Sequence, residues 1–511
     1  RPLAFLRAPY WDSTLVEADT EPFSLPILHP SDRTMLSSQK NLTKSFFMLL
    51  SLPATAMGFA LSVQISALSW ILSTKYHLEI EEIGLVWAAG PIAGILGQVV
   101  IGIISDNVWF WNGRRRPFIL IGGVLATLML LALPNIDVIS TAMGIEGILG
   151  VAIAVALTLD LAINVSFNPT RSVIADVTLE GTERTKGYTW MQTVSGTFGV
   201  LAYAVGAVMG NITLIYGGAV LVFLFSVVPT FFIEEPRELR DDQGAAAAGP
   251  GFSFNELVRT TRPLWGFFIY SVYAMTLRVM EVDLGDYWVE AGLGVLTVFL
   301  VAESLFKKEE GLSKEAASDL GFKKILAAHS FTWVGVQTMF VYMFAYVTYE
   351  MPGLSDVQMG RVVSVSFLVL NAVGALLPAF VLEPITEKIG RVKTHMACLG
   401  VMTLGYSGIL FMGGTPLMVY IMMGVVGVGW AATVSLPFAI MSQKVDQTKM
   451  GLYMGLFNLS VVLPQLVASL GIGELIGAAA NKNIIFAICA GSLLISTLAW
   501  TLVKENAPAN A

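Results

Sequence analysis

One apolar stretch of the chain carries a regular series of polar side chains. Within residues 158–176, Asp160, Asn164, Asn168 and Arg171 follow one another at spacings of four, four and three. On a helix of 3.6 residues per turn, these side chains lie on one face. A charged side chain near the centre of a bilayer costs about 2.5–3.5 kcal/mol on insertion scales. The series therefore predicts a helix whose polar face lines a water-filled or protein-lined cavity rather than lipid.

Asp160 has the chemistry that coupling to protons requires. A carboxyl group in a partly dry cavity can donate a hydrogen bond to a bound solute when protonated, and can only accept one when ionised. Arg171 lies roughly 16 Å further along a straight helix. We expect it to take part in proton coupling together with Asp160, and to pair with a carboxylate nearer the cytosol as a gate. The alternatives are a helix-locking ion pair for Asp160, and a structural salt bridge or phospholipid contact for Arg171.

The composition is that of a polytopic membrane protein. Of 511 residues, 55% are hydrophobic and 13% are charged, whereas soluble domains carry about 25% charged residues. The two cysteines, Cys398 and Cys489, lie inside apolar runs, which excludes a disulfide framework and a multi-cysteine metal site. The four histidines share no ligand spacing, so we expect neither a metal site nor a cofactor.

Apolar runs long enough to cross a bilayer, roughly 18–25 residues each, define the organisation of the chain. They lie near residues 45–72, 83–105, 117–134, 144–169, 188–209, 213–233, 326–348, 361–382, 395–413, 416–440, 451–476 and 483–503. Two weaker runs, 264–280 and 287–306, follow the sixth. We expect this pair to form an extra transmembrane hairpin, and the alternative is amphipathic helices on the membrane surface. The prediction is twelve core spans, or fourteen with the inserted pair.

Lysine and arginine are concentrated in the N-terminal tail, the central linker and alternate loops, which places both termini in the cytosol. The chain then divides into a cytosolic tail (1–43), a six-helix half (44–236) and a linker with the inserted pair (237–325). A second six-helix half (326–503) and a C-terminal tail (504–511) follow. Two sets of six spans separated by a polar linker are typical of duplicated transporters. We expect a monomeric, multi-pass protein of the plasma membrane, specifically a bacterial inner membrane.

An internal repeat at the cytosolic ends of the second and eighth spans supports this duplication. Residues 105–116 and 383–393 each contain an acid, a short gap, a glycine and basic residues. We interpret the first copy as a conformational latch, in which acid and arginines pair in one state and separate in another. The alternative is a positive-inside anchor without a gating role. The predicted latch residues are Asp106, Arg114, Arg115 and Arg116.

Several strings of the sequence resemble the major facilitator superfamily, in particular its branch of plant sucrose–proton symporters, related animal transporters and bacterial maltose or sucrose homologues. The strings are WAAGP (87–91), SDNVWFWNGRRRPF (105–118), LDLAINVSFNPTRSVIAD (159–176), VSLPFAIMS (434–442) and GLYMGLFNLSVVLPQLVASLG (451–471). The resemblance covers almost all of residues 45–503 except 250–310. It implies an all-α membrane fold of two six-helix halves and proton-driven uptake of a disaccharide or other glycoside.

The resemblance also assigns roles to single residues. Asp160 matches the family's proton-accepting carboxylate, Arg171 matches the arginine eleven residues later, and Asn164 matches a neighbouring polar residue of the site. Arg361 and Asn371 resemble the arginine and asparagine of the family's eighth helix, with a spacing that differs by one. We expect a gating role for Arg361.

The seventh span departs from the family pattern. The plant proteins have two acidic residues near its end, whereas this chain has the single, slightly displaced Glu350. The secondary charge network of the family, and the details of coupling that depend on it, are therefore in question.

Sugars are recognised by paired hydrogen bonds and by aromatic faces that cover their C–H surfaces. We expect substrate contacts from Asp160, Asn164, Gln64, Trp333, Gln337, Asn371, Asn458 and Gln465. For each amide the alternative is a hydrogen bond between helices.

The predicted function is a proton-coupled symporter that imports a maltose- or sucrose-type disaccharide or glucoside by alternating access. The alternative is a secondary transporter of a non-sugar solute, such as an amino sugar, polyamine or drug-like cation. An enzyme is not expected, because no nucleophile–base motif, phosphate loop or metal cluster appears. A sensor or scaffold would carry a soluble output domain, and the sequence has none. The expected partners are the sugar, protons and the lipid bilayer, without nucleic acid.

Overall fold

The computed structural model describes residues 37–95, 104, 108–145, 147–178, 182–236, 254–280, 282, 284–285, 287–445 and 450–505. Regular structure in these ranges consists of α-helices joined by short 3-10 and π-helical segments. The prediction of an all-α chain is therefore confirmed for the part of the chain that the structure describes.

Every apolar run of the N-terminal half coincides with a helix or begins in one. The helices are α2 (Lys44–Thr74), α3 (Ile80–Trp87), α5 (Arg116–Ala132), α7 (Ile148–Val177), α8 (Thr182–Met209) and α9 (Asn211–Phe232). A short α1 (Ser37–Lys40) precedes α2, and η2 (Leu133–Asn135) and α6 (Ile136–Met143) follow α5. The second run begins with α3, and residues 96–103 of this run lie outside the described ranges.

The C-terminal half repeats this arrangement. Its long helices are α13 (Lys314–Glu350), α14 (Asp356–Leu377), α16 (Arg391–Met412), α17 (Pro416–Ser442), α18 (Met450–Val467) and α20 (Ile484–Trp500). The π-helical segments η5 (Pro378–Leu382) and η7 (Ala468–Ile472) continue α14 and α18 into α15 (Glu383–Ile389) and α19 (Gly473–Ala478). α13 begins ahead of the predicted run 326–348, because its first turns are polar and hydropathy does not detect them.

The inserted segment folds as a helical hairpin against the second half. It comprises α10 (Phe254–Thr260), η4 (Arg262–Leu264), α11 (Trp265–Met280) and α12 (Trp288–Phe306). α11 and α12 pack against each other, and the Tyr273 hydroxyl donates a hydrogen bond of 2.8 Å to Glu290 Oε1. α12 also packs against α13, and α11 packs against α18 and η7. With 19 residues, α12 is long and apolar enough to cross a membrane.

Side-chain caps explain where several long helices begin. Thr43 accepts a hydrogen bond from the backbone N–H of the third residue of α2, and Ser313 and Thr415 do the same for α13 and α17. Ser355 and Gln358 form a reciprocal capping box at the start of α14. These caps satisfy backbone donors that a helix N-terminus leaves free, so the helices start at the polar residues before the apolar runs.

Glycines permit close contact between helices of the first half. A Cβ at Gly122 would lie 2.1 Å from Ser166 Oγ, and one at Gly123 would lie 2.1 Å from Ser226 Cβ. α5 therefore approaches α7 and α9 more closely than any side chain would allow, a packing mode typical of membrane helices.

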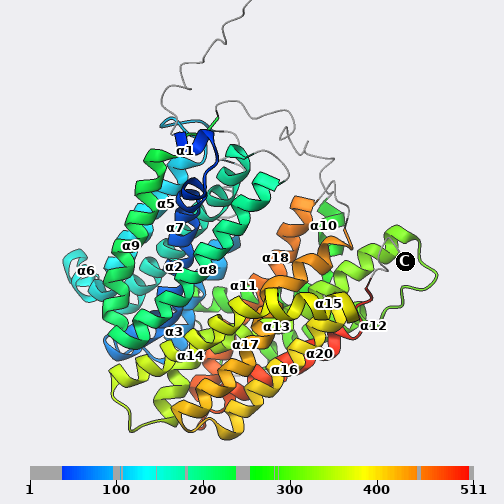
Figure 1. The fold of residues 1–511 in the computed structure, drawn as a ribbon. Coiled ribbons are helices and arrows are strands. Elements are labelled where there is room, and N and C mark those ends of the chain that lie inside the picture. Colours follow the sequence, from blue (N-terminus) through cyan, green and yellow to red (C-terminus); the bar gives the residue numbers. More distant parts are fainter. Residues whose placement is uncertain are drawn as a thin grey trace, which may run out of the picture.

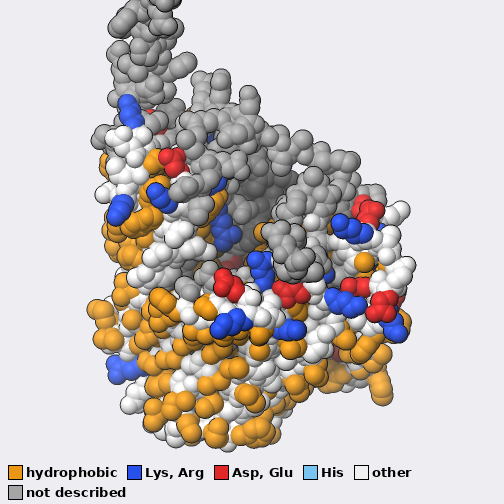
Figure 2. All heavy atoms as spheres, turned by 45° about the vertical axis from the view of Figure 1, so that its right-hand side comes forward, with side chains coloured by type: hydrophobic (Ala, Val, Ile, Leu, Met, Phe, Trp, Pro, Cys, Tyr) orange, Lys and Arg blue, Asp and Glu red, His pale blue; other side chains and the backbone are white. Residues whose placement is uncertain are grey.

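The surface of the helical body is apolar. Ten helices of the described chain are long and apolar enough to cross a membrane. Large hydrophobic side chains such as Val208, Phe231, Phe380 and Phe411 point outwards and are 67–80% exposed. Figure 2 shows hydrophobic side chains over the lower part of the face in view, with most of the charged groups above them. This distribution is that of a bundle embedded in lipid.

The two halves form separate bundles that meet at one end. In Figure 1 the first half (blue to green) and the second (yellow-green to red) converge towards α3 and α14, and they diverge towards α1. α14 packs against α8, and α3 packs against α19 and η7. These contacts join the two halves at that end.

Candidate transport site

Asp160 lies in the interior of α7 and is 5% exposed. Gln64 of α2, itself 2% exposed, donates a hydrogen bond of 2.9 Å from Nε2 to Asp160 Oδ2. A Cβ at Gly90 would lie 3.4 Å from the same oxygen. Because Gly90 has no side chain, a third segment of backbone can reach the carboxyl group. Within the described residues Asp160 forms no ion pair, so a cation does not neutralise it there.

The polar stripe of α7 continues from Asp160 towards the far end of the helix. The Asn164 amide donates a hydrogen bond of 2.8 Å to the backbone carbonyl of Asp160, one turn back on the same helix. Asn164 and Asn168 are both half-buried. The predicted common face is therefore present, with Asn164 held against its own helix.

Arg171 is exposed at the end of this stripe. Its guanidinium lies 4.4 Å from the centre of the Phe167 ring, and its backbone carbonyl accepts a hydrogen bond of 3.2 Å from the Tyr188 hydroxyl. Among the described residues no carboxylate pairs with it. Asp176, the penultimate residue of α7, instead pairs with Arg115, with 3.1 Å between its Oδ2 and Arg115 Nε.

The arginine triplet binds a carboxylate that the sequence interpretation did not include. Glu235, just after α9, accepts the backbone N–H groups of Arg114, Arg115 and Arg116 at 2.7, 2.8 and 2.6 Å. It therefore caps the N-terminus of α5, where free backbone donors favour an anion. Asp106, the predicted acidic partner, lies outside the described residues.

The second half contains an equivalent N-terminal cap. Glu505, just after α20, accepts the backbone N–H groups of Arg391 and Val392 at 2.7 and 3.3 Å. It caps the N-terminus of α16 as Glu235 caps α5. An acid after the last apolar run of each half was the signal that could have identified both residues.

Aromatic side chains form a wall on the second half. Trp333 of α13 and Trp430 of α17 meet edge to face, with ring centres 6.2 Å apart. Trp430 Nε1 donates a hydrogen bond of 3.3 Å to Asn371 Oδ1 of α14, and the Asn371 amide donates one of 2.9 Å to Phe367 O. The sequence interpretation missed Trp430, because a single tryptophan in an apolar run carries no signal of its own.

Three further predicted residues have side-chain amides that bond to no other residue in the described ranges. Gln337 is buried on α13, and Asn458 and Gln465 are half-buried on α18. None forms a hydrogen bond to another described residue, so their amides remain available to a ligand. Arg361 is exposed in the second turn of α14, and no described carboxylate pairs with it.

A line of hydrogen bonds closes the site at the end where the halves meet. The hydroxyls of Ser66 and Ser364 lie 2.7 Å apart, and Ser364 also donates to Asn211 Oδ1 at 3.1 Å. Ser69 donates to the carbonyl of Val341 at 2.8 Å, and Trp70 Nε1 donates to that of Asp356 at 3.0 Å. These contacts join α2 and α9 to α13 and α14, on the far side of Asp160 from Arg171.

Comparison with known proteins gives a consistent set of relatives. The sequence matches the model of a family described as Major Facilitator Superfamily over residues 50–469. It is similar to the sucrose transport protein SUC4 of Arabidopsis thaliana, with 24% identity over 499 residues and 88% of each chain covered. It is 25% identical over 471 residues to the sucrose transport protein SUT2 of Oryza sativa subsp. indica, covering 82% of this chain and 85% of that protein. A general alpha-glucoside permease of Schizosaccharomyces pombe is 27% identical over 254 residues, covering 44% of this chain and 45% of that protein.

Solved structures share the architecture at low sequence identity. The POT family transporter PepTSo superposes with a TM-score of 0.63 and 13% identity, covering 90% of this chain and 98% of that chain. The xylose transporter XylE from E. coli, in an inward open conformation, gives 0.59 and 14%, covering 90% and 96%. At these identities the likeness shows the fold alone. The predicted fold and the predicted resemblance are both confirmed.

Proposed function

Because the chain belongs to the major facilitator superfamily, and is thus a transporter rather than an enzyme, we propose that it is a proton-coupled symporter. The proposed substrate is a maltose- or sucrose-type disaccharide or a glucoside, which enters by alternating access. The names of its relatives support a sugar, because they include sucrose transport proteins and an alpha-glucoside permease.

The hydrogen bond between Gln64 and Asp160 is the observation that carries this proposal. It leaves one oxygen of a buried carboxyl group facing the interior without a neutralising cation among the described residues. A proton is the smallest charge that can neutralise such a group, and the neutral acid can then donate to a sugar hydroxyl. Binding of a proton and of sugar at one carboxyl group would couple their free energies.

Residues of both halves would bind the substrate, each half a different part of it. Asp160, Gln64 and Asn164 would bind one part of the sugar by hydrogen bonds. The aromatic wall of Trp333 and Trp430 would cover the C–H face of the other part. Amides that have no partner among the described residues would complete the hydrogen bonding from the second half: Gln337, Asn458 and Gln465, beside Asn371.

The proposed cycle moves the halves 44–236 and 326–503 against each other. We call the hydrogen-bonded contact between the halves at Ser66 and Ser364 the seam. With both termini in the cytosol, the closed seam faces outwards and the site opens inwards. This arrangement corresponds to the step at which sugar and proton leave. Separation of the seam, with pairing of cytosolic groups such as Arg171 and the latch residues, would open the site to the outside.

Transport by purified protein in liposomes tests the proposal. Under an inside-alkaline pH gradient, sugar should accumulate, and a panel of disaccharides, glucosides, amino sugars and polyamines identifies the substrate class. Asp160→Asn should lose gradient-driven accumulation while retaining binding or downhill movement of the solute. Glu310→Gln, which changes a carboxylate that is 80% exposed, is the matched control. Full accumulation by Asp160→Asn would remove Asp160 from the coupling mechanism.

A further inference from the structure

A cavity of about 190 Å³ lies between the two halves, at the end of the molecule opposite α1. Ser73, His77 and Glu79 line it from the C-terminal end of α2 and the connection to α3, and Thr348 and Tyr349 line it from the end of α13. Hydrogen bonds of Ser69 separate the cavity from the transport site. Ser69 donates to Val341 O at 2.8 Å and accepts from Trp87 Nε1 at 2.8 Å. The cavity is therefore distinct from the interior around Asp160.

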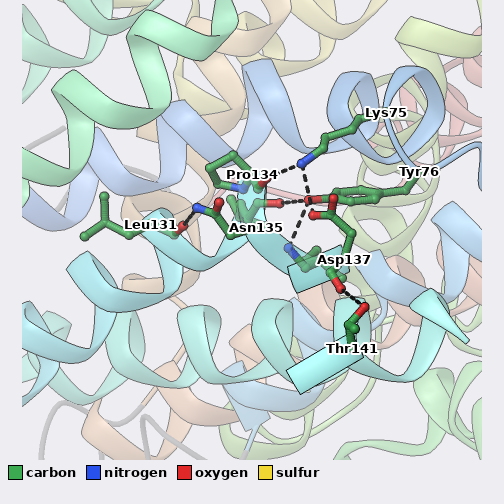
Figure 3. A network of polar contacts seen from close by, with 9 residues as sticks. Lys75, Tyr76, Leu131, Pro134, Asn135, Asp137 and Thr141 are labelled. Carbon is green, nitrogen blue, oxygen red and sulfur yellow. Dashed lines mark hydrogen bonds and ion pairs between the residues drawn. The ribbon is translucent and has the colours of Figure 1, made fainter. Parts of the chain in front are cut away.

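The wall from the first half is held in a fixed shape. His77 has a φ of +54°, a left-handed backbone conformation that is costly for residues with a side chain. Its two predecessors are anchored to η2 and to α6, as Figure 3 shows. Lys75 lies 3.0 Å from Asp137 Oδ1, and the Tyr76 hydroxyl donates to Leu133 O at 2.8 Å. Strained backbone that the surroundings impose is frequent at binding sites.

The wall from the second half is equally fixed. Lys482 is 6% exposed, and its Nζ donates hydrogen bonds of 2.8, 2.9 and 2.8 Å to the carbonyls of Ile476, Gly477 and Ala479. The same Nζ lies 5.1 Å from the centre of the Tyr349 ring. The tyrosine is thereby held at the edge of the cavity, with one face against a cation.

The groups that line the cavity suit a hydroxylated ligand. Within the described part of the chain, the Ser73 hydroxyl and the His77 ring form no hydrogen bond, and the Glu79 carboxylate is exposed. The volume equals that of roughly six water molecules and falls below the ~300 Å³ of sites for larger ligands. We propose that this cavity is a second binding site, reached from the outer face, for a single pyranose ring and too small for a disaccharide.

A ligand in this site would act on the transport cycle, an effect that rests on the proposed function. Its walls come from both halves, so the cavity has this shape only while the outer ends are together. A ligand that binds one arrangement better shifts the population towards it. An external monosaccharide would therefore hold the outer-closed state and slow the return of the carrier, lowering the maximal rate of disaccharide uptake without raising KM.

Binding is tested first, independently of transport. The probe is D-glucose, a free pyranose that is not a glucoside, and the readout is the thermal unfolding midpoint of detergent-solubilised protein. The midpoint should rise with the probe in the parent and in Asp160→Asn, and the shift should be lost in Ser73→Leu and Thr348→Leu, which fill the cavity. His77→Gly should also lose the shift while unfolding at a higher temperature without ligand, because glycine relieves the positive φ. Thr141→Leu, an exposed hydroxyl on α6, should keep it.

Three outcomes overturn the proposal: no shift in the parent, a shift that disappears in Asp160→Asn, or a shift that persists in both Ser73→Leu and His77→Gly. Uptake assays then test the coupling, since external probe should lower the maximal rate in the parent and leave Ser73→Leu unaffected. A protein that binds the probe at this cavity but transports no sugar refutes the proposed function alone. A protein that transports sugar but shows no shift refutes the second site alone.

Discussion

Gln64 donates a hydrogen bond of 2.9 Å to Asp160, and this contact joins α2 to α7 inside the first half. The helix α2 also carries Ser66 and Ser69, which bond to the second half, so the contact connects this helix to the carboxyl group of Asp160. A change of conformation that moves α2 relative to α7 must therefore alter the surroundings of Asp160.

The first prediction concerns this contact. Gln64→Leu removes the donor and leaves a buried carboxyl oxygen without a partner, which costs about 1–3 kcal/mol. We expect gradient-driven sugar accumulation to fall by roughly tenfold or more, measured as initial uptake into liposomes. Gln64→Glu should be more severe, because it places a second carboxyl group against Asp160. Wild-type accumulation by Gln64→Leu would contradict a role for this contact in transport.

The second prediction concerns the seam between the halves. The hydroxyls of Ser66 and Ser364 lie 2.7 Å apart, so the double variant Ser66→Cys with Ser364→Cys should form a disulfide under oxidation. The crosslink should abolish uptake, and reduction should restore it, since the halves can then separate. Cys398 and Cys489 are buried and give little background. Each single cysteine variant is the control, and full uptake by the oxidised double variant would show that the seam does not open.

Much of this architecture could be predicted from the sequence, because lipid imposes long apolar helices and a cavity requires polar residues on one face. The common face of Asp160 and Asn164 followed from spacing alone. Two details did not follow. The Asn164 amide donates to the backbone carbonyl of Asp160, one turn earlier in the same helix. Such local bonds compete with bonds to a ligand, and the spacing of residues does not reveal them. Glu235 caps a helix 119 residues away in sequence, a pairing that no local pattern specifies.

The third prediction compares the two caps. Glu235→Ala leaves three backbone donors at the start of α5 without their acceptor, and we expect a loss of about 2 kcal/mol of unfolding free energy. Glu505→Ala leaves two such donors and should cost about 1 kcal/mol. Unfolding in detergent should therefore rank the variants in this order. Glu310→Ala, an exposed acid, should change little, and a larger effect there would discredit the ranking.

The fourth prediction concerns the attachment of the inserted hairpin. Lys324 of α13 forms an ion pair of 3.0 Å with Glu309, which follows α12, and the two side chains are 5% and 12% exposed. Lys324→Met leaves the carboxylate buried without its cation and should destabilise the protein by about 3–5 kcal/mol. The double variant Lys324→Met with Glu309→Leu should recover most of that loss. Equal unfolding midpoints for the single and double variants would mean that the pair does not hold the hairpin.

The cap at Glu505 has a practical consequence for handling the protein. Its carboxylate belongs to the packing of α16 rather than to a dispensable tail, so reporters and affinity tags should be joined beyond it. A truncation before Glu505 would remove an integral part of the second bundle even though α20 ends at Trp500. Libraries of shortened or fused variants should therefore keep Glu505.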